Sequence, residues 1–369
     1  MPPDRSLDAR LAPRLAQLKA QDRYRTRRVI SGGHGVHAVV DGRKLLNFCS
    51  NDYLGLATHP KVLAAAQAAL GEGCGSTASP LLGGHNRHHR ALEDALASAT
   101  CYPRALLFTS LIDGGRLSGA HCRRVAHADL AGFAAALAAA PHPAQRLVVT
   151  DSVFSMDGDL APLTELRALT RHAGASLMVD DAHGFGVLGA HGGGIVEHLD
   201  MGDLRPEIYV ATLGKSLGSA GAFVAGSETL IEYLVQRARS WVFSTAPPPA
   251  LSAAALVALQ IVQGEPEHRR HLNALIARFR ARAAEAGLPL MPSLTPIQPL
   301  VIGRDADALA ASARLMEAGY WVAAIRPPTV PEGTARLRIT LSAAHGTAEV
   351  DGLVHALREA VRAPAEVAV

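Results

Sequence analysis

Apolar residues follow two different periods along the first two thirds of this chain. Short apolar runs, typical of buried strands, alternate with longer stretches in which apolar residues return every three or four positions, as on one face of a helix. The helical stretches include residues 162–172 and 228–241. This alternation predicts a mostly parallel sheet with helices on both faces. The expected strands are residues 105–108, 123–126, 147–150, 176–179, 208–210 and 222–224.

The two ends of the chain have different patterns. Residues 5–28 predict a basic amphipathic helix, and residues 37–48 predict a hairpin that turns at Asp41-Gly42. Three prolines at 247–249 break the chain before two long helices, and residues 299–361 then mix strands and helices as in a compact α+β domain. We therefore expect an N-terminal helix and hairpin segment at residues 1–60, a large α/β domain at 61–260 and a C-terminal α+β domain at 261–369.

Composition narrows the class of protein. Hydrophobic residues make up 49% of the 369 residues, which is enough to bury a sizeable core. The net charge is only +3 and the arginines are scattered, which argues against nucleic acid as a partner. No apolar run approaches a membrane span and no signal peptide is visible, so we expect no membrane association and a reducing cytoplasm.

Cysteine and histidine spacing gives little indication of a metal site. The four cysteines form no Cys-x-x-Cys pair, so neither a disulfide framework nor a zinc site is indicated. The histidine-rich stretch at residues 84–89 leads into an amphipathic helix, and we interpret it as a loop and helix start rather than a metal cluster.

Candidate chemistry begins with a lysine at the end of an expected strand. Lys215 lies among small residues just after the apolar run 208–210. Most lysines lie on a solvated face, and a lone Gly-Lys-Ser is usually a loop. Small neighbours, however, leave room for a carbonyl cofactor beside an amine nucleophile. A nucleotide-binding loop is excluded, because Tyr209 stands where that motif needs glycine.

A second polar cluster lies about thirty residues upstream. Asp180, Asp181 and His183 follow the expected strand at 176–179. Taken alone, they could form a helix N-cap with an incidental histidine. Ligands of parallel sheets bind at the carboxyl ends of strands, where Asp180, His183, Thr212 and Lys215 all fall. An Asp–His pair after one strand and a lysine after a later one form the polar skeleton of a pyridoxal phosphate (PLP) site.

Five stretches match one family in order over nearly the whole chain. They lie at residues 48–56, 153–159, 179–184, 212–215 and 324–331. The chain resembles the α-oxoamine synthases of the class-II aminotransferase-like, fold-type I PLP enzymes. The resemblance implies an α/β fold-type I PLP transferase, whose mostly parallel sheet is sandwiched by helices, with a smaller C-terminal α+β domain.

The resemblance also implies roles for individual residues. Lys215 would hold PLP as a Schiff base and, once released, remove the Cα proton of the substrate. Asp180 would face the pyridine nitrogen, and His183 would hydrogen-bond the phenolic oxygen. Arg338 would take the amino-acid carboxylate. Other implied cofactor residues are Ser155, Thr212 and Thr245 (or Ser244), the last donated by the second subunit of a homodimer, and other implied substrate residues are Arg25, Asn51, Arg326 and Thr329.

Residues 324–331, with 297–300, indicate which reaction to expect. They are most similar to the family member that acts in biotin biosynthesis. The implied reaction is a decarboxylative condensation of L-alanine with pimeloyl-CoA or pimeloyl-acyl carrier protein. Two alternatives remain open: a sibling that condenses glycine with a short acyl-CoA, and a catalytically impaired protein with the PLP fold.

One part of the family pattern is missing. Family members follow the first strand with a turn that cradles the phosphate, a helix, a strand and a histidine that stacks on PLP. Here Thr109-Ser110 passes directly to Leu111-Ile112. The printed sequence omits a stretch, or the chain is a truncated and inactive relative, or the deletion is real and tolerated. Because each charge-assisted phosphate bond contributes about 1.5–3 kcal/mol, cofactor affinity could fall by orders of magnitude.

Overall fold

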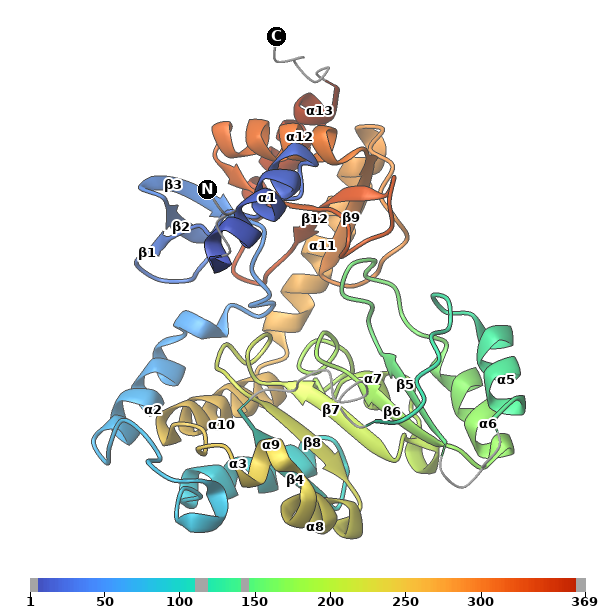
Figure 1. Ribbon diagram of the computed structural model, residues 1–369. Helices are drawn as coiled ribbons and strands as arrows, with labels where there is room; N and C mark the ends of the chain where they lie inside the picture. Colours follow the sequence, from blue (N-terminus) through green and yellow to red (C-terminus); the bar gives the residue numbers. More distant parts are fainter. Residues whose placement is uncertain (1–5, 110–118, 141–145, 363–369) are drawn as a thin grey trace. The chain divides into compact units, whose positions relative to one another are not determined.

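The computed structural model describes residues 6–109, 119–140 and 146–362, and the chain folds into two compact units (Figure 1). The larger unit is Asn51–Asn273. The smaller unit combines Met1–Ser50 with Ala274–Val369, so both ends of the chain belong to one unit.

The larger unit is built on a five-stranded sheet in the order β4-β8-β7-β6-β5. β8 is antiparallel to both of its neighbours, whereas β7, β6 and β5 pair in parallel. Four of the five strands therefore run in one direction, and the expected mostly parallel sheet is confirmed with one reversed strand. The strands are β4 (Arg104–Phe108), β5 (Leu147–Asp151), β6 (Ser176–Asp180), β7 (Ile208–Thr212) and β8 (Ala222–Gly226).

Helices cover this sheet because its strands are apolar on both faces. All five residues of β8 are buried, as are four of the five in β4. Leu106, Val210 and Val224 pack with Ile231 and Trp241 from the short helices that follow β8. The described helices of this unit are α2 (Pro60–Leu70), α3 (Arg87–Ala99), α5 (Leu130–Ala138), α6 (Leu163–Ala173), α7 (Ile195–His198), α8 (Glu228–Arg237), α9 (Arg239–Val242) and α10 (Pro249–Gly264), while α11 (Glu267–Glu285) continues into the smaller unit.

β5 is the exception among these strands. Within the described residues it pairs with β6 on one side and lies at the edge of the sheet. Its Leu147 and Val149 side chains are 50% and 54% exposed. Such exposure is unusual for a strand of a parallel sheet, which is normally covered on both faces. It agrees with the absence from the sequence of a strand that β5 would otherwise pair with.

The expected strand at residues 123–126 is wrong. These residues adopt no regular secondary structure, although Val125 lies close to β5. A strand needs a neighbour to bond its N–H and C=O groups, and no described strand pairs with this stretch. The junction at Ser110-Leu111, where the family pattern is interrupted, lies outside the described residues.

The smaller unit contains two small sheets. One has the order β1-β2-β3-β10 and includes the expected hairpin, in which Val40 pairs with Arg43 around Asp41-Gly42. The other is antiparallel, with the order β11-β12-β9, and carries α12 (Asp305–Glu317) and α13 (Thr347–Arg362). The strands are β1 (Ile30–Ser31), β2 (His37–Val40), β3 (Arg43–Asn47), β9 (Ile297–Gly303), β10 (Tyr320–Trp321), β11 (Ala323–Ile325) and β12 (Ala335–Thr340).

The N-terminal helix α1 (Leu7–Ala20) is shorter than the expected 5–28. Ser6 caps it by accepting a hydrogen bond from the Ala9 amide at 3.1 Å. None of its residues is buried. Four leucines recur along it at helical spacing and are each at least 40% exposed: Leu7, Leu11, Leu15 and Leu18.

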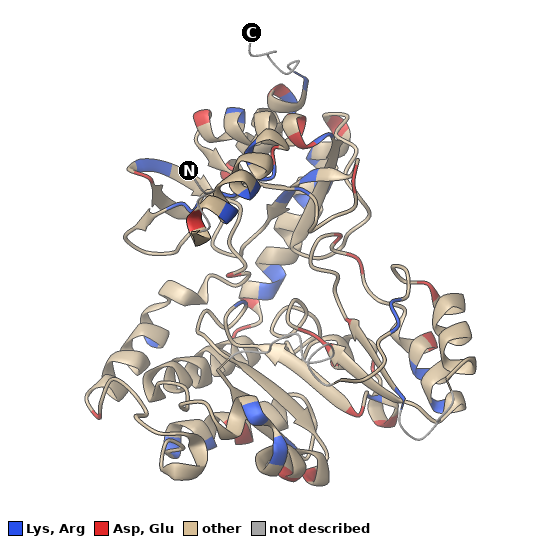
Figure 2. Cartoon of the chain, viewed as in Figure 1, with Lys and Arg blue, Asp and Glu red and all other residues tan. Residues whose placement is uncertain are grey.

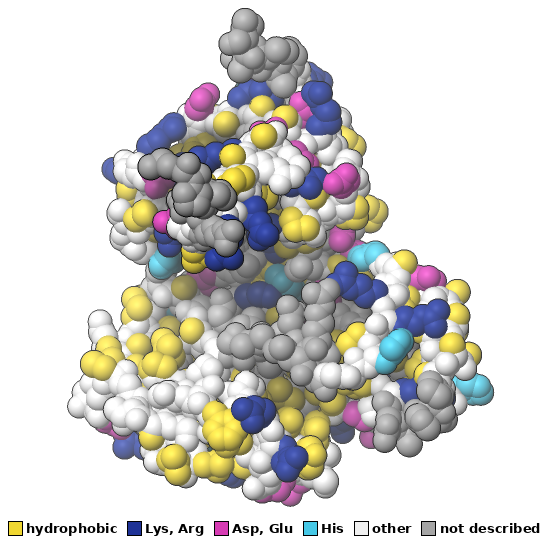
Figure 3. All heavy atoms as spheres, viewed as in Figure 1, with side chains coloured by type: hydrophobic (Ala, Val, Ile, Leu, Met, Phe, Trp, Pro, Cys, Tyr) yellow, Lys and Arg dark blue, Asp and Glu magenta, His cyan; other side chains and the backbone are white. Residues whose placement is uncertain are grey.

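Charged residues are interspersed along both units (Figure 2). On the face shown in Figure 3, lysine and arginine side chains occur singly or in small groups, and no continuous basic stripe crosses that face. Among the described helices, none is both long and apolar enough to cross a membrane.

A buried histidine links the hairpin of the smaller unit to its C-terminal segment. The His345 ring stacks on Phe48 with 4.0 Å between ring centroids. Its Nδ1 accepts from the Ser342 amide at 3.0 Å, and its Nε2 donates to the Asn47 carbonyl at 3.1 Å. Burial lowers the pKa of His345 to about 4, so the ring is neutral in the folded protein.

This histidine should make the protein sensitive to acid. An unfolded histidine binds a proton below about pH 6.5, whereas folded His345 resists it until about pH 4, so stability falls as pH decreases through that window. At about 1.4 kcal/mol per pKa unit the loss is roughly 3 kcal/mol. Urea unfolding at several pH values should show a flatter dependence between pH 6.5 and 4 for His345→Gln than for the native protein. Equal slopes would contradict this assignment.

Candidate functional site

Lys215 lies in the turn that follows β7, beside the segment that follows β6. Its Nζ atom is 2.8 Å from Nε2 of His183, and the histidine is only 9% exposed. β6 and β7 are adjacent and parallel, with Asp180 paired with Val210, so their carboxyl ends meet at one edge of the sheet. The structure thus brings together the lysine and the histidine that the sequence placed at neighbouring strand ends.

The turn around Lys215 is held by close packing. The Ser216 hydroxyl donates to the Phe185 carbonyl at 2.5 Å, which ties this turn to the segment after β6. Gly218 has a φ of +60°, and a Cβ atom there would lie 2.2 Å from the Ala57 amide nitrogen. A larger residue at Gly218 would therefore displace the turn that carries Lys215.

Two residues near the start of the larger unit are hydrogen-bonded, directly or through one another, to the His183 nitrogen that faces away from Lys215. The Tyr53 hydroxyl is 2.5 Å from His183 Nδ1 and donates to Asn51 Oδ1 at 3.2 Å. Tyr53 is 1% exposed. Asn51 was among the expected site residues, but Tyr53 was missed, although it stands in the same matched stretch two positions later.

Acidic residues also gather at this edge of the sheet. Asp180 ends β6, is partly exposed, and accepts from the Ala182 amide at 2.9 Å. Asp151 ends the neighbouring strand β5. Burial, with a further contribution from the Asp180 charge, raises the pKa of Asp151 to about 6, and Lys215 opposes this shift. Asp151, Asp180 and Lys215 therefore share one electrostatic environment, and sequence reasoning missed Asp151.

Asp181 is more deeply buried than the adjacent Asp180. Its carboxylate is fully buried and accepts from the hydroxyls of Ser152 and Tyr209 and, at 2.8 Å, from the Ile195 amide. Burial raises the pKa of Asp181 to about 6 although these bonds favour the charged form. Asp181 thus joins β7 to the segments after β5 and β6, and its role is to hold the edge of the sheet together.

The other expected cofactor residues occupy separate positions in the larger unit. The Thr212 hydroxyl, at the end of β7, donates to the Gly221 carbonyl at 3.0 Å and accepts from the Gly214 amide at 3.2 Å. Ser155 is partly exposed in the loop after β5. Thr245 is exposed, and Ser244 partly exposed, in the segment between α9 and α10.

Four of the expected substrate residues belong to the smaller unit. Arg25 Nη2 donates to Thr329 Oγ1 at 3.1 Å, which brings together the two residues expected to contact the acyl substrate. Arg326 donates to the Asp22 carbonyl. Arg338, on β12, is 7% exposed and donates to Thr340 Oγ1 at 3.0 Å. Its charge opposes the effect of burial, which raises the pKa of Cys49 to about 12.

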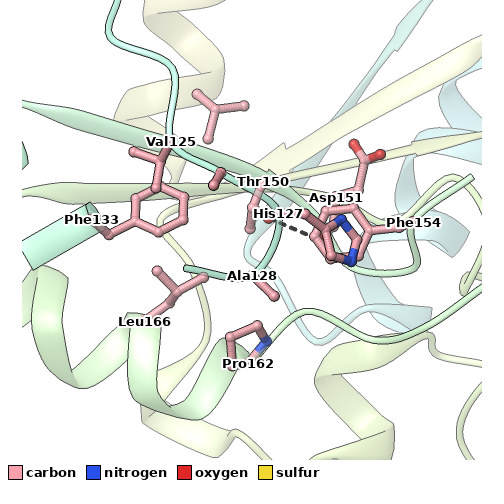
Figure 4. Close-up of a pocket in the computed structure, with 11 residues that line it drawn as sticks. Val125, His127, Ala128, Phe133, Thr150, Asp151, Phe154, Pro162 and Leu166 are labelled. Carbon is pink, nitrogen blue, oxygen red and sulfur yellow. Dashed lines mark hydrogen bonds between the residues drawn. The ribbon is translucent and has the colours of Figure 1, made fainter. Parts of the chain in front are cut away.

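A pocket of about 270 Å³ lies beside the open edge of β5 (Figure 4). Val149, Thr150 and Asp151 line it from the strand, and Phe133 and Leu166 line it from α5 and α6. The walls are largely apolar, with Asp151 and His127 as its charged or titratable members. The remaining lining residues are Val125, Ala126, Ala128, Phe154 and Pro162.

The histidine-rich stretch is a loop and helix start, as expected. The Asn86 side chain accepts from the His88 and His89 amides and so caps α3. His85 Nε2 lies 2.9 Å from a Glu93 carboxylate oxygen, and His89 Nε2 lies 2.7 Å from the Pro247 carbonyl. These contacts explain the stretch as local structure.

Known proteins resemble this chain in both sequence and structure. A sequence profile of the aminotransferase class I and II family matches residues 102–357. The 8-amino-7-oxononanoate synthase of Methylococcus capsulatus is 52% identical, with 95% of this chain and 98% of that protein aligned. The enzyme of the same name from Pseudomonas putida (strain GB-1) is 51% identical, with 95% of this chain and 96% of that protein aligned.

Solved structures of two kinds of enzyme resemble this chain in fold. A serine palmitoyltransferase of Sphingomonas wittichii superposes with a TM-score of 0.89 at 29% identity and covers 97% of this chain and 98% of its own. The 8-amino-7-oxononanoate synthase of Francisella tularensis has a TM-score of 0.73 at 26% identity and covers 86% and 98%. A further structure, described as SPT with a PLP internal aldimine, has a TM-score of 0.90 at 25% identity and covers 97% and 99%.

The alignment length shows that at least one relative has residues that this chain lacks. The Methylococcus alignment extends over 379 positions, more than the 369 residues of this chain, so that relative has residues without a counterpart here. The exposed edge of β5 agrees with such a loss. Over the aligned 95% of this chain, about half of the residues are identical to those of each relative, which is far above chance. The chain therefore belongs to the class I and II aminotransferase family and, within it, to the 8-amino-7-oxononanoate synthases.

Proposed function

We propose that this chain condenses L-alanine with a pimeloyl thioester, on CoA or acyl carrier protein, to give 8-amino-7-oxononanoate for biotin synthesis. The observation that carries the proposal is the Lys215–His183 pair at 2.8 Å, at the carboxyl edge of the sheet, in a chain about half identical to enzymes of that name. The pair provides a half-buried amine with a polar partner that directs it.

The residues at this edge fit PLP as cofactor. An amine, an imidazole and a carboxylate gather where β6 and β7 end. Lys215 would hold the aldehyde carbon, His183 the phenolic oxygen and Asp180 the ring nitrogen, with Ser155 and Thr212 as further contacts and Thr245 contributed by the second subunit of a homodimer. When bound, PLP supplies an electron sink for a carbanion at the amino-acid Cα.

The chain's own groups account for the proton and charge steps. The Lys215 amine takes the Cα proton of alanine, a general-base role that contributes about 10²–10⁴-fold in rate. His183 directs that amine through its Nε2 atom. The Asp180 carboxylate favours the protonated form of a ring nitrogen beside it. We assign the alanine carboxylate to the guanidinium of Arg338, with Arg326 as a second candidate, and the acyl donor to Arg25, Thr329 and Asn51.

A substrate comparison tests this function. With added PLP, the protein should release 8-amino-7-oxononanoate, detected by mass spectrometry, from L-alanine and pimeloyl-CoA. Pimeloyl-acyl carrier protein in place of pimeloyl-CoA identifies the preferred donor. Product from glycine and acetyl-CoA, and none from alanine, would overturn the proposal in favour of the sibling reaction.

A PLP titration separates weak cofactor binding from loss of function. Because the phosphate-cradling turn of the family is missing from the sequence, saturation should require more PLP than in the Pseudomonas putida relative, by about tenfold for each 1.4 kcal/mol of lost contact. Visible absorbance that rises with PLP and disappears in Lys215→Ala would support an active site of reduced affinity. No absorbance and no product at any PLP concentration would support the impaired protein.

A further inference from the structure

We propose that His59, Glu265 and His268 form a binding site for a divalent transition-metal ion such as Zn²⁺, which the proposed reaction does not use. One ligand atom from each side chain, an imidazole nitrogen or a carboxylate oxygen, lies within 4.8 Å of the other two. All three residues belong to the larger unit and are partly exposed, so an ion can reach them from solvent. The metal joins the start of α2 to the junction of α10 and α11.

The packing of α2 against α10 brings two of the ligands together, although they are distant in sequence. At one end of this helix pair, Ala69 near the end of α2 is buried with Ala250 and Ala253 near the start of α10. At the other end, His59 caps the start of α2 and Glu265 caps the end of α10. The two helices therefore run in opposite directions, which places the imidazole beside the carboxylate.

His268 adds the third ligand from the first turn of α11. Its Nε2 atom is 3.7 Å from Glu265 Oε2, and its ring lies edge-on to that of His59 with 6.1 Å between the centroids. Two ligand atoms that each lie about 2.1 Å from a tetrahedral zinc ion are roughly 3.4 Å apart. Small side-chain rotations would therefore bring the three ligands to coordination distance.

The chemistry of the three donors favours zinc over other common ions. Two histidines and one glutamate hold zinc in metallopeptidases, with water in the fourth position. Ca²⁺ and Mg²⁺ take oxygen ligands, which two imidazoles do not supply. The hydrogen bond from Lys61 lowers the pKa of Glu265, so this side chain is a carboxylate at neutral pH and repels an anion.

Metal binding disturbs only two contacts at the surface. His59 Nδ1 accepts from the Lys61 amide at 3.3 Å, which is longer than most such bonds. Lys61 Nζ lies 2.7 Å from Glu265 Oε1, whereas Oε2 is the oxygen near His268. The Lys61 side chain is 65% exposed, and surface ion pairs of this kind are weak. Lys61 thus competes with a metal for the charge of Glu265 without being a ligand.

Calorimetric titration with Zn²⁺ tests the site in the full chain without PLP. Native protein should bind Zn²⁺, and His268→Gln and Glu265→Gln should each weaken binding by at least about 10–100-fold, because loss of a ligand costs no less than loss of a group that orients one. Circular dichroism with EDTA checks that the variants are folded. Unchanged affinity in either variant, as expected if an exposed cysteine binds the ion, would overturn the proposal.

Two further variants distinguish this site from other zinc binding. Lys61→Gln removes the competing charge and should tighten binding by about two- to fivefold, the scale of a surface ion pair. His127→Gln alters the other group at metal-ligand spacing within the described residues, which includes Asp157 and Asp159, and should leave the affinity unchanged. Binding that is lost in His127→Gln and kept in His268→Gln, or weakened in Lys61→Gln, would refute the assignment.

Thermal unfolding tests whether the metal joins the helices. An ion that binds only the folded chain stabilises it, so Zn²⁺ at about 100 times its Kd should raise the Tm of native protein. The same concentration should not raise the Tm of Glu265→Gln. No shift in native protein, or an equal shift in Glu265→Gln, would contradict the proposal. None of these measurements depends on product formation, so they fail or succeed separately from the proposed function.

Discussion

Lys215→Ala should abolish both product formation and covalent attachment of PLP. Loss of the general base alone would lower turnover by at least about 10²–10⁴-fold, and no other group at this edge of the sheet is an amine among the described residues. Borohydride reduction of the PLP-treated protein, followed by peptide mass spectrometry, should place the added mass on the peptide that contains Lys215.

The borohydride labelling is easy to interpret because the chain has few lysines. The sequence contains four lysines, and the three others, Lys19, Lys44 and Lys61, are all exposed. Lys61 pairs with Glu265 at 2.7 Å on the surface, so Lys61→Ala is a matched control that should retain both label and activity. Label on another lysine, or turnover in Lys215→Ala near the native rate, would refute the assignment.

Asp181→Ala should be the most destabilising single change at this edge of the sheet. It would leave the hydroxyls of Ser152 and Tyr209 and the Ile195 amide without their buried acceptor. Each unsatisfied group costs about 1–3 kcal/mol, so we expect a loss of about 3–5 kcal/mol in the free energy of unfolding. Urea unfolding monitored by circular dichroism at neutral pH measures this loss.

The adjacent aspartate provides the control. Asp180 is partly exposed and accepts one backbone hydrogen bond from Ala182, so Asp180→Ala should cost about 1 kcal/mol in stability. Its effect should instead fall on product formation. If Asp181→Ala unfolded at the same urea concentration as Asp180→Ala, the structural role of Asp181 would be wrong.

The adjacent residues Asp180 and Asp181 show what the sequence alone could not predict. Both aspartates follow the same strand, and the resemblance assigned Asp180 to the ring nitrogen. Nothing in the local pattern indicates that Asp181 is the buried one, because its partners Ser152, Ile195 and Tyr209 come from three other segments. Burial and shared hydrogen bonds depend on contacts that are distant in the chain.

The expected strand at residues 123–126 shows a related limit. Its apolar residues have the local pattern of a strand, but a strand forms only where a neighbour supplies hydrogen-bond partners. Within the described residues β5 lies at the edge of the sheet, and the residues at 123–126 do not pair with it. The periodicity of apolar residues alone cannot show whether a neighbouring strand is present to pair with them.

By itself the sequence determined most of the strands and helices, the lysine and histidine at adjacent strand ends, and the family. These depend on local periodicity and on motifs whose residues are close in the chain. Only the tertiary structure showed that the Tyr53 hydroxyl is hydrogen-bonded to His183 and that the Lys215 charge acts on the pKa of Asp151. It also showed that Asp181 is fully buried and accepts hydrogen bonds from three segments. The physical reason is that hydrogen-bond direction, burial and charge interaction are set by groups that folding brings together.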